Sequence, residues 1–146
     1  MLIGQIRTVL GTCALVVTAA CLRSTAEPPG TAPIAGSWAY VAQQSTGNQA
    51  TLSGTLTLIS ESTSSYRGAL DALETTSLGG QRRLAGPITG RVVNAASVDF
   101  TVTFGASQRE HVGTLRADTI VGTWFEVGGL SGVSAAGSFR AIRTSR

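Results

Sequence analysis

Residues 120–127 decide the fold and read Ile-Val-Gly-Thr-Trp-Phe-Glu-Val. Because side chains alternate between the two faces of a strand, Ile120, Gly122 and Trp124 share one face. A glycine flanked at two positions on either side by an apolar or aromatic residue recurs along the chain, in Ile34-Gly36-Trp38, Leu52-Gly54-Leu56, Tyr66-Gly68-Leu70, Leu84-Gly86-Ile88, His111-Gly113-Leu115 and Ala135-Gly137-Phe139. Glycine inside a strand usually marks a bend, a bulge or a close approach. The pattern predicts one sheet that bends repeatedly until it closes.

Apolar and polar residues alternate in eight segments separated by short turns. The clearest segment is 50–59, where Leu52, Leu56 and Leu58 share a face opposite a row of threonines and serines. Such alternation is typical of a strand with one dry face and one solvated face. The expected strands are 36–43, 50–59, 66–73, 82–93, 98–104, 109–116, 119–127 and 135–143, with a short helical turn over 69–73 as an alternative within the third.

These strands predict an all-β domain over residues 34–146. Sequential strands usually pair with their neighbours, and eight are enough to close an antiparallel up-and-down barrel around side chains or one small ligand. An open sandwich is the alternative, but it would leave the first and last strands as unprotected edges. Pro87 has outward parity in the fourth strand. It requires a bulge or an unpaired position there because proline has no backbone N–H.

The N-terminal residues resemble a bacterial lipoprotein signal and stand apart from the fold. Arg7 is the only charge in the first 20 residues, an apolar run covers 9–17, and the small residues Ala19 and Ala20 precede Cys21. This resemblance implies a signal peptide over residues 1–20, lipidation of Cys21 and a flexible tether over 21–33. An ordinary secretory signal is the alternative, whereas a retained anchor is disfavoured because a membrane span needs ~20 apolar residues.

The same segment predicts where the protein resides. Residue 22 is Leu, not the Asp that marks inner-membrane retention in many Gram-negative lipoproteins. The resemblance therefore implies a lipid anchor on the periplasmic side of the outer membrane, with secretion as the alternative. Cys13 would leave with the signal and Cys21 would carry lipid. The mature chain would then have no thiol for a disulfide, a metal site or a nucleophile.

The charge pattern argues against a nucleic-acid partner. The chain has 11 basic residues, all of them Arg, and 8 acidic ones. Only Arg82 and Arg83 are adjacent, whereas nucleic-acid binding favours a clustered basic patch with exposed aromatic residues. One histidine and scattered carboxylates also give no metal-ligand cluster. We expect no nucleic acid, metal or cofactor to bind.

The triplet Gly36-Ser37-Trp38 resembles the Gly-X-Trp signature of lipocalins and other calycin-like barrels. The resemblance implies an arginine of the final strand packed over Trp38, and Arg143 has the inward parity for this, with Arg140 as the second candidate. The size and the repeated glycines look closer to avidin-type barrels or small bacterial protease-inhibitor barrels. The chain departs from both, because 128–134 lacks the Trp of avidin-like biotin sites and the disulfide usual in the inhibitors is absent.

Ten residues with inward parity are candidates for a ligand site in the barrel lumen. Small-molecule sites are mostly apolar and contain a few placed polar groups. The aromatic candidates are Trp38, Tyr40, Tyr66, Phe100, Phe104, Trp124 and Phe139, and the polar candidates are His111, Glu126 and Arg143. The alternative interpretation is that these rings fill the lumen as an ordinary core.

Three functions remain open at this point. The first is a lipid-anchored, non-enzymatic barrel that binds a small apolar or amphipathic molecule in its lumen. The second is a filled barrel that binds a protein partner through loops such as 74–81 or 128–134, as a periplasmic protease inhibitor would. The third is a hydrolase or isomerase built on His111 and Glu126, which is disfavoured because no nucleophile motif frames a serine or threonine. We therefore assign no catalytic residue.

Overall fold

A computed structural model describes residues 34–127 and 132–146. The expected signal peptide over 1–20, the lipidated Cys21, the tether over 21–33 and residues 128–131 lie outside the described residues. The expectations that concern them remain predictions.

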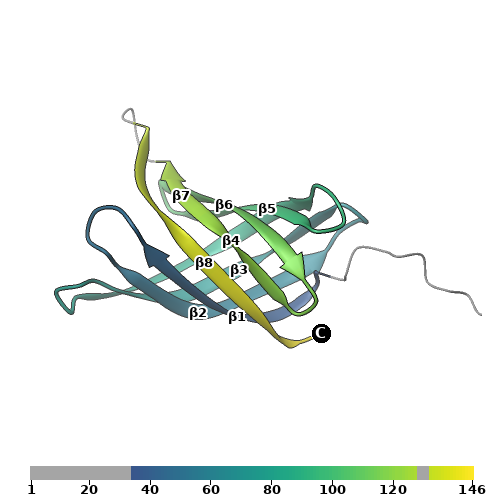
Figure 1. Ribbon diagram of the computed structural model, residues 1–146, viewed down its shortest axis with the longest axis horizontal. Helices are drawn as coiled ribbons and strands as arrows, with labels where there is room; N and C mark the ends of the chain where they lie inside the picture. Colours follow the sequence, from purple (N-terminus) through teal and green to yellow (C-terminus); the bar gives the residue numbers. More distant parts are fainter. Residues whose placement is uncertain (1–33, 128–131) are drawn as a thin grey trace, which may run out of the picture.

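The described residues form a closed barrel of eight antiparallel strands that follow one another in sequence order (Figure 1). The strands are β1 (Gly36–Gln44), β2 (Thr51–Ser60), β3 (Ser65–Thr75), β4 (Gln81–Val92), β5 (Ser97–Phe104), β6 (Ser107–Arg116), β7 (Thr119–Val127) and β8 (Val133–Ser145). The ring closes where β8 pairs with β1. This confirms the all-β up-and-down barrel. The open sandwich and the helical turn over 69–73 were wrong alternatives.

The barrel has two distinct ends. We call the mouth the end that carries the turns after β1, β3, β5 and β7, which lies at the left in Figure 1. We call the closed end the opposite one, which carries the turns 61–64, 93–96 and 117–118 together with the start of β1 and the end of β8. The closed end therefore holds both ends of the described barrel.

The strand glycines lie where neighbouring backbones come too close for a side chain. A Cβ atom at Gly68 in β3 would collide with the carbonyl group of Thr57 on β2. A Cβ atom at Gly90 in β4 would lie 2.5 Å from the ring of Tyr66. Both positions show that these glycines permit close approach, which is one of the uses expected for glycine within strands.

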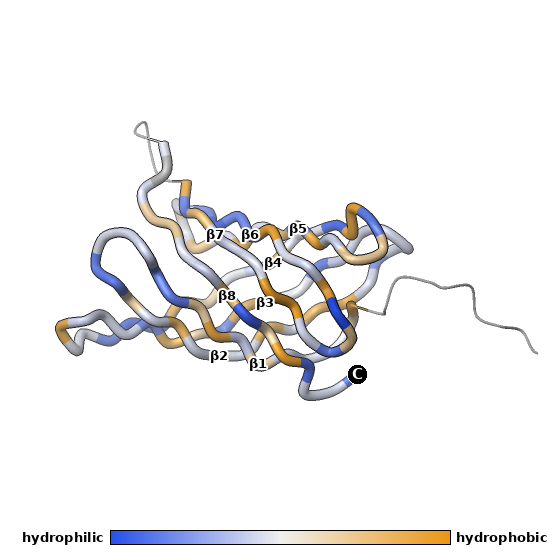
Figure 2. The backbone as a smooth tube through the Cα atoms, viewed as in Figure 1, coloured by the Kyte–Doolittle hydropathy of each residue, from blue (hydrophilic) through white to orange (hydrophobic). Residues whose placement is uncertain are grey.

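Inward side chains fill most of the barrel. Hydrophobic and hydrophilic residues alternate along the strands (Figure 2), and the inward rows meet in one core. The largest fully buried side chains include Trp38, Tyr40, Tyr66 and Trp124. Such interdigitation is what an eight-stranded barrel of this width allows, because its interior is just wide enough for side chains.

Pro87 occupies a position that needs no strand partner on one side. It is exposed on β4, and the β4–β5 ladder begins only at Ile88. This agrees with the outward parity and the unpaired position expected for it.

Within the described part of the chain, no helix is long and apolar enough to cross a membrane.

Candidate functional site

The closed end is sealed by Trp38 and Arg143. The indole Nε1 of Trp38 donates to the carbonyl of Ile34 at 3.1 Å. The Arg143 guanidinium lies 4.1 Å from the centre of the Trp38 ring, and its Nε donates to Asp118 Oδ1 at 2.9 Å. Arg143 is thus the arginine that packs over Trp38, as expected, while Arg140 faces outward and is exposed. A cation over an aromatic face stabilises this seal.

The middle of the barrel holds a compact aromatic cluster around His111. The imidazole stacks on Phe100 with ring centres 4.3 Å apart, and Phe139 meets it edge-on at 5.1 Å. Nδ1 of His111 lies 3.2 Å from the carbonyl of Arg109, which can only accept, so Nδ1 carries the proton. Nε2 then accepts from the Tyr40 hydroxyl at 2.9 Å. Both ring nitrogens are therefore used in the interior of the fold.

The protonation states of this cluster follow from its burial. Burial lowers the pKa of His111 to about 3, so the imidazole is neutral at ordinary pH. Burial likewise raises the pKa of Tyr40, which stays a neutral hydrogen-bond donor. Glu126 lies on the neighbouring strand but pairs with Arg109 and not with His111. The arrangement lacks the histidine–carboxylate pairing that activates a nucleophile.

The mouth contains a chain of four charged side chains that crosses the lumen. Arg82 Nη2 donates to Glu74 Oε2 at 2.6 Å, and Arg109 Nη2 donates to Glu74 Oε1 at 3.0 Å. Arg109 Nε donates to Glu126 Oε2 at 2.7 Å. Glu74 comes from β3, Arg82 from β4, Arg109 from β6 and Glu126 from β7. The chain therefore ties one side of the barrel to the other.

Arg109 lies at the centre of this network. Its side chain is only 4% exposed, and its guanidinium lies 4.6 Å from the centre of the Trp124 ring and 5.4 Å from that of Phe104. Burial alone would raise the pKa of Glu74, but hydrogen bonds from Arg109 and Arg82 outweigh it and hold that pKa below its usual value. Glu74 therefore stays charged between its two arginine partners, and Arg109 is also paired with Glu126.

A hollow of about 200 Å³ lies above this network, at the mouth. Its walls are predominantly polar and come from Gln44, Asn48, Ala50, Glu74, Thr76, Arg82, Arg109, Glu126, Ser134 and Ala135. The hollow is smaller than the roughly 300–1,000 Å³ of a typical pocket for a drug-sized ligand. It can admit a small molecule or the polar end of a larger one.

Two buried donors in the barrel have no hydrogen-bond partner among the described residues. They are Nη1 of Arg109 and Nε1 of Trp124. Buried polar groups are nearly always paired, so each exception calls for an explanation.

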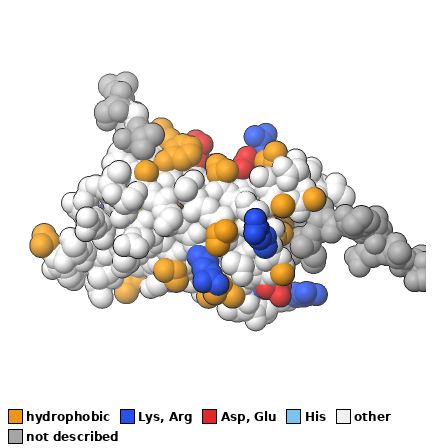
Figure 3. All heavy atoms as spheres, viewed as in Figure 1, with side chains coloured by type: hydrophobic (Ala, Val, Ile, Leu, Met, Phe, Trp, Pro, Cys, Tyr) orange, Lys and Arg blue, Asp and Glu red, His pale blue; other side chains and the backbone are white. Residues whose placement is uncertain are grey.

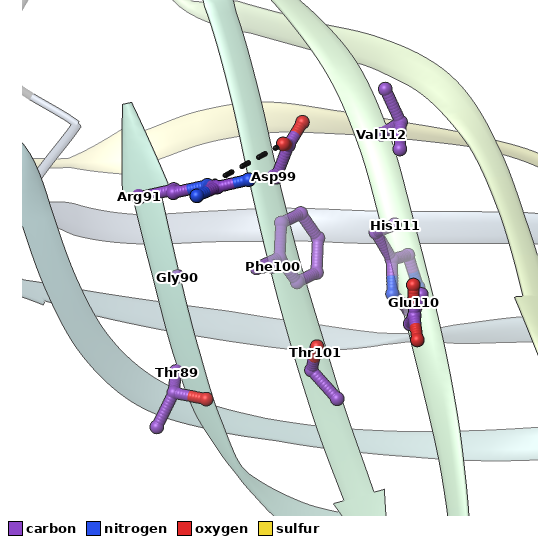
Figure 4. Close-up of a pocket in the computed structure, with 9 residues that line it drawn as sticks. All are labelled: Thr89, Gly90, Arg91, Asp99, Phe100, Thr101, Glu110, His111 and Val112. Atoms are coloured by element: carbon purple, nitrogen blue, oxygen red, sulfur yellow. Dashed lines mark ion pairs between the residues drawn. The ribbon is translucent and has the colours of Figure 1, made fainter. Parts of the chain in front are cut away.

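A second hollow of about 400 Å³ lies on the outer surface of β4, β5 and β6. Figure 4 shows the residues that line it, which are Thr89, Gly90, Arg91, Asp99, Phe100, Thr101, Glu110, His111 and Val112. Arg91 and Asp99 form an ion pair across it at 3.8 Å.

The face viewed in Figure 3 carries apolar and charged side chains interspersed among other side chains and backbone. Within residues 34–127 and 132–146, no three His, Cys, Asp or Glu side chains gather as a metal site requires.

The ten expected lumen residues all lie inside the barrel but not around one cavity. Trp38, Tyr66 and Arg143 lie toward the closed end, Phe104 and Glu126 lie toward the mouth, and the others occupy the levels between them. Of the ten, Glu126 alone lines the mouth hollow. The other rings pack mainly on one another, which is how a core is filled.

Sequence reasoning missed three of the four charged residues at the mouth. Glu74 falls in the expected loop 74–81 and Arg82 opens the expected fourth strand, whereas in the structure both have the parity of the inward rows of β3 and β4. Arg109 shares the parity of His111 on β6. Inward parity carried to the ends of the strands would have found all three.

The comparisons with known proteins reveal a similarity of fold. No protein-family model matches the chain, and no curated protein does. Among solved structures, it is similar to EF1p2_mFAP2b bound to DFHBI, with a TM-score of 0.60 and 15% identity over 75% of this chain and 93% of that chain. It is also similar to a de novo designed fluorescence-activating β-barrel (TM-score 0.55, 15% identity, 75% and 93% coverage). A redesigned β-barrel, mFAP1, bound to DFHBI gives a TM-score of 0.56 at 14% identity, with 75% and 93% coverage. At these identities the likeness shows a shared barrel fold.

Proposed function

We propose that this protein is a lipid-anchored, non-enzymatic β-barrel that binds a small amphipathic molecule at the mouth of its lumen. The observation that carries the proposal is the contrast between the two ends. Trp38 and Arg143 seal one end, whereas a hollow of about 200 Å³ lies at the other, above Arg109 and Trp124. Barrels of similar fold hold the small dye DFHBI, which supports ligand binding as a use of this architecture.

The chemistry of the mouth favours an amphipathic ligand over a purely apolar one. Charged and amide side chains form the hollow, while the rings of Trp124 and Phe104 lie against the guanidinium of Arg109. Buried polar groups need polar partners, so an apolar molecule alone would leave them unsatisfied. A ligand with a polar end and a short apolar or aromatic body fits both components.

Lipid anchoring completes the proposal. The resemblance of residues 1–22 to a lipoprotein signal supports lipidation of Cys21 and residence on the periplasmic side of the outer membrane. β1 begins at the closed end, so the tether would join the barrel there. A flexible tether of the length of 22–33 would span roughly 20 Å on average. The mouth would then face away from the membrane, and the ligand would enter from the aqueous side.

Native mass spectrometry of residues 22–146, which contain every described strand, tests ligand binding. Spectra before and after solvent extraction should show a discrete small molecule in stoichiometric amount. Ala135 lines the hollow, so Ala135→Leu should abolish the adduct, whereas Ser138→Leu on the outward face of the same strand should keep it. An adduct that survives Ala135→Leu would place the ligand elsewhere.

Anchoring is tested on the full chain. Metabolic labelling with a radioactive fatty acid should mark the wild type, and Cys21→Ser should lose both the label and the association with the membrane fraction. An unlabelled wild type that appears in the culture medium would support ordinary secretion.

A filled barrel that binds a protein partner is the second candidate. It is favoured by the tight packing of the aromatic residues and by the outer hollow of about 400 Å³, which is larger than the one at the mouth. A stoichiometric partner recovered by cross-linking, and lost with Thr101→Arg in that outer hollow but not with Thr144→Arg on β8, would favour this function. A native mass spectrum that shows the protein without a bound small molecule would also favour the filled barrel.

A further inference from the structure

Two arginines on the outside of the barrel lack the carboxylate partner that the others have. Every other described arginine has a carboxylate oxygen within 4.0 Å. Arg116 on β6 and Arg140 on β8 are exposed and have no such partner among the described residues. We infer that the surface around these two arginines docks on a bilayer of anionic phospholipids. The inference deepens the proposed lipid anchoring and rests on it.

The register of the strands places the two arginines on one side of the barrel. Arg140 pairs with Val121 on β7 and with Val41 on β1. Arg116 lies in the adjacent row of outward residues, in line with Ile142 of β8. We call these five outward side chains the docking face.

The docking face combines arginine with exposed aliphatic side chains. Val41 is 56% exposed, Val121 44% and Ile142 43%. On the side of the barrel that carries β8, arginine side chains (blue) lie among hydrophobic ones (orange) in Figure 3. A bilayer surface suits both components, because guanidinium groups bind lipid phosphates while their alkyl stems and the neighbouring aliphatic side chains lie against the interface.

The charges on the two sides of the barrel point to an anionic partner. No outward residue of β1, β7 or β8 in the described part of the chain is acidic. On the opposite side of the ring, Arg67 of β3 and Arg83 of β4 pair with Glu61 and Asp71. Positive charge is therefore balanced on that side and unbalanced on the docking face. At an anionic bilayer, each arginine strengthens binding roughly fivefold.

The predicted tether would approach the bilayer from the same side of the barrel. β1 begins at Gly36, and Ser37 pairs with Ser145 at the end of β8. The chain that precedes β1 therefore joins the barrel at the closed end, beside strands of the docking face. A flexible tether over 22–33 that spans roughly 20 Å would hold this face close to the membrane. The mouth lies at the other end of β1 and β8, so it would stay in water.

A second copy of the chain fits this face less well than a bilayer does. In a symmetric dimer the same patch meets itself, so Arg116 and Arg140 would approach the same two arginines of the partner. Like charges across an interface are unfavourable. A bilayer carries the opposite charge and also accommodates the aliphatic side chains.

Binding of residues 22–146 to lipid vesicles tests the docking face without the lipid anchor. Vesicles of phosphatidylglycerol should bind the barrel, vesicles of phosphatidylcholine should not, and high salt should release it. Arg116→Gln combined with Arg140→Gln should weaken binding to phosphatidylglycerol roughly thirtyfold at about 0.1 M salt.

A matched control removes the same net charge from the opposite side of the barrel. Arg67→Gln combined with Arg83→Gln should weaken binding less than about threefold, because screening limits the reach of a charge to about 10 Å at that salt concentration. Circular dichroism checks that each variant keeps its β-sheet signal.

A fluorescent label reports which side of the barrel meets the lipid. Residues 22–146 contain no cysteine, so Val121→Cys can be labelled selectively with a fluorophore that brightens in apolar surroundings. It should brighten on phosphatidylglycerol vesicles. The same label at Thr89→Cys, which is exposed on β4, should not.

The outcomes separate the docking face from the proposed function. Equal losses of binding in the two double variants, or equal brightening of the two labels, would overturn the assignment of the face. Absence of vesicle binding would overturn docking altogether, and so would an acidic protein that cross-links to Val121→Cys and competes with the vesicles. Fatty-acid labelling of Cys21 would still support the anchor in these cases. A chain that lacks this label but binds phosphatidylglycerol would reject the anchor and keep the docking face.

Discussion

His111 and Tyr40 are buried polar residues that satisfy each other. The hydroxyl donates to Nε2, and Nδ1 donates to a backbone carbonyl. A fully satisfied pair of this kind helps to fix the packing of a core. The single histidine of the chain is therefore assigned a structural role.

This pair makes stability depend on pH. Burial lowers the pKa of His111 to about 3 in the folded barrel, whereas an unfolded histidine titrates near 6.5. Between these values the unfolded chain binds a proton that the fold excludes, so stability is complete above about pH 6.5 and falls by up to about 1.4 kcal/mol per pH unit as the pH drops. Urea unfolding at several pH values should show this slope.

The control is the double variant Tyr40→Phe/His111→Leu, which replaces both partners with apolar groups. Its remaining acid sensitivity comes from carboxylates such as Glu74, whose pKa is held low. The wild type should lose more stability than this variant between about pH 6.5 and pH 4. Equal losses would mean that His111 is protonated within the fold.

Arg143 and Arg140 allow a comparison of two arginines on one strand. Arg143 is 5% exposed over Trp38, while Arg140 faces solvent. Arg143→Ala should lower the free energy of unfolding by about 2 kcal/mol because a desolvated cation–π contact is lost. Arg140→Ala should change it by less than about 0.5 kcal/mol. Chemical denaturation measures both, and similar values for the two would contradict the sealing role of Arg143.

At the scale of the strand, bending depends on glycine at defined positions. Gly68 lies against the carbonyl group of Thr57 on the neighbouring strand, whereas Gly80 lies in an exposed turn near the flexible side chain of Thr76. Gly68→Ala should cost about 2 kcal/mol or more, because the added methyl forces two backbones apart. Gly80→Ala should stay within about 0.5 kcal/mol. Thermal unfolding followed by circular dichroism compares them, and a mild effect at Gly68 would show that the strands can separate freely there.

The strands themselves could be predicted because period-two alternation is a local property. It placed Trp38, Tyr40, Trp124 and Phe139 correctly in the interior, and the glycine spacing indicated closure. The pairing of Arg109 with Glu74 could not be predicted in this way, since β3 and β6 meet only across the closed lumen. Parity gives the direction of a side chain. Whether side chains fill the lumen depends on the volume of the lumen, which is defined only when all eight strands have paired into a ring.

At the scale of the whole molecule, the mouth network joins opposite sides of the barrel. Glu74 is 8% exposed and binds two arginines, while Glu126 is 21% exposed and binds one of them. Glu74→Gln should destabilise the barrel by about 3 kcal/mol because it leaves Arg109 buried with half of its compensation. Glu126→Gln should cost less, about 1 kcal/mol, since water reaches that position. Urea unfolding of both variants at neutral pH measures these two losses of stability. A larger loss for Glu126→Gln than for Glu74→Gln would show that the ion pair at the rim contributes more to stability than the buried one.

The pairing of β8 with β1 has a consequence for how the chain matures. The ladder that completes the ring joins Ala42 to Phe139, residues at opposite ends of the barrel sequence. Contacts between such distant segments form late and slowly, because the long intervening loop must be ordered first. An exported chain of the proposed kind would pass through the translocation channel with β8 emerging after the other seven strands. The final ladder could not form before transport was complete, so the order of its strands would itself delay folding until the chain had reached its compartment.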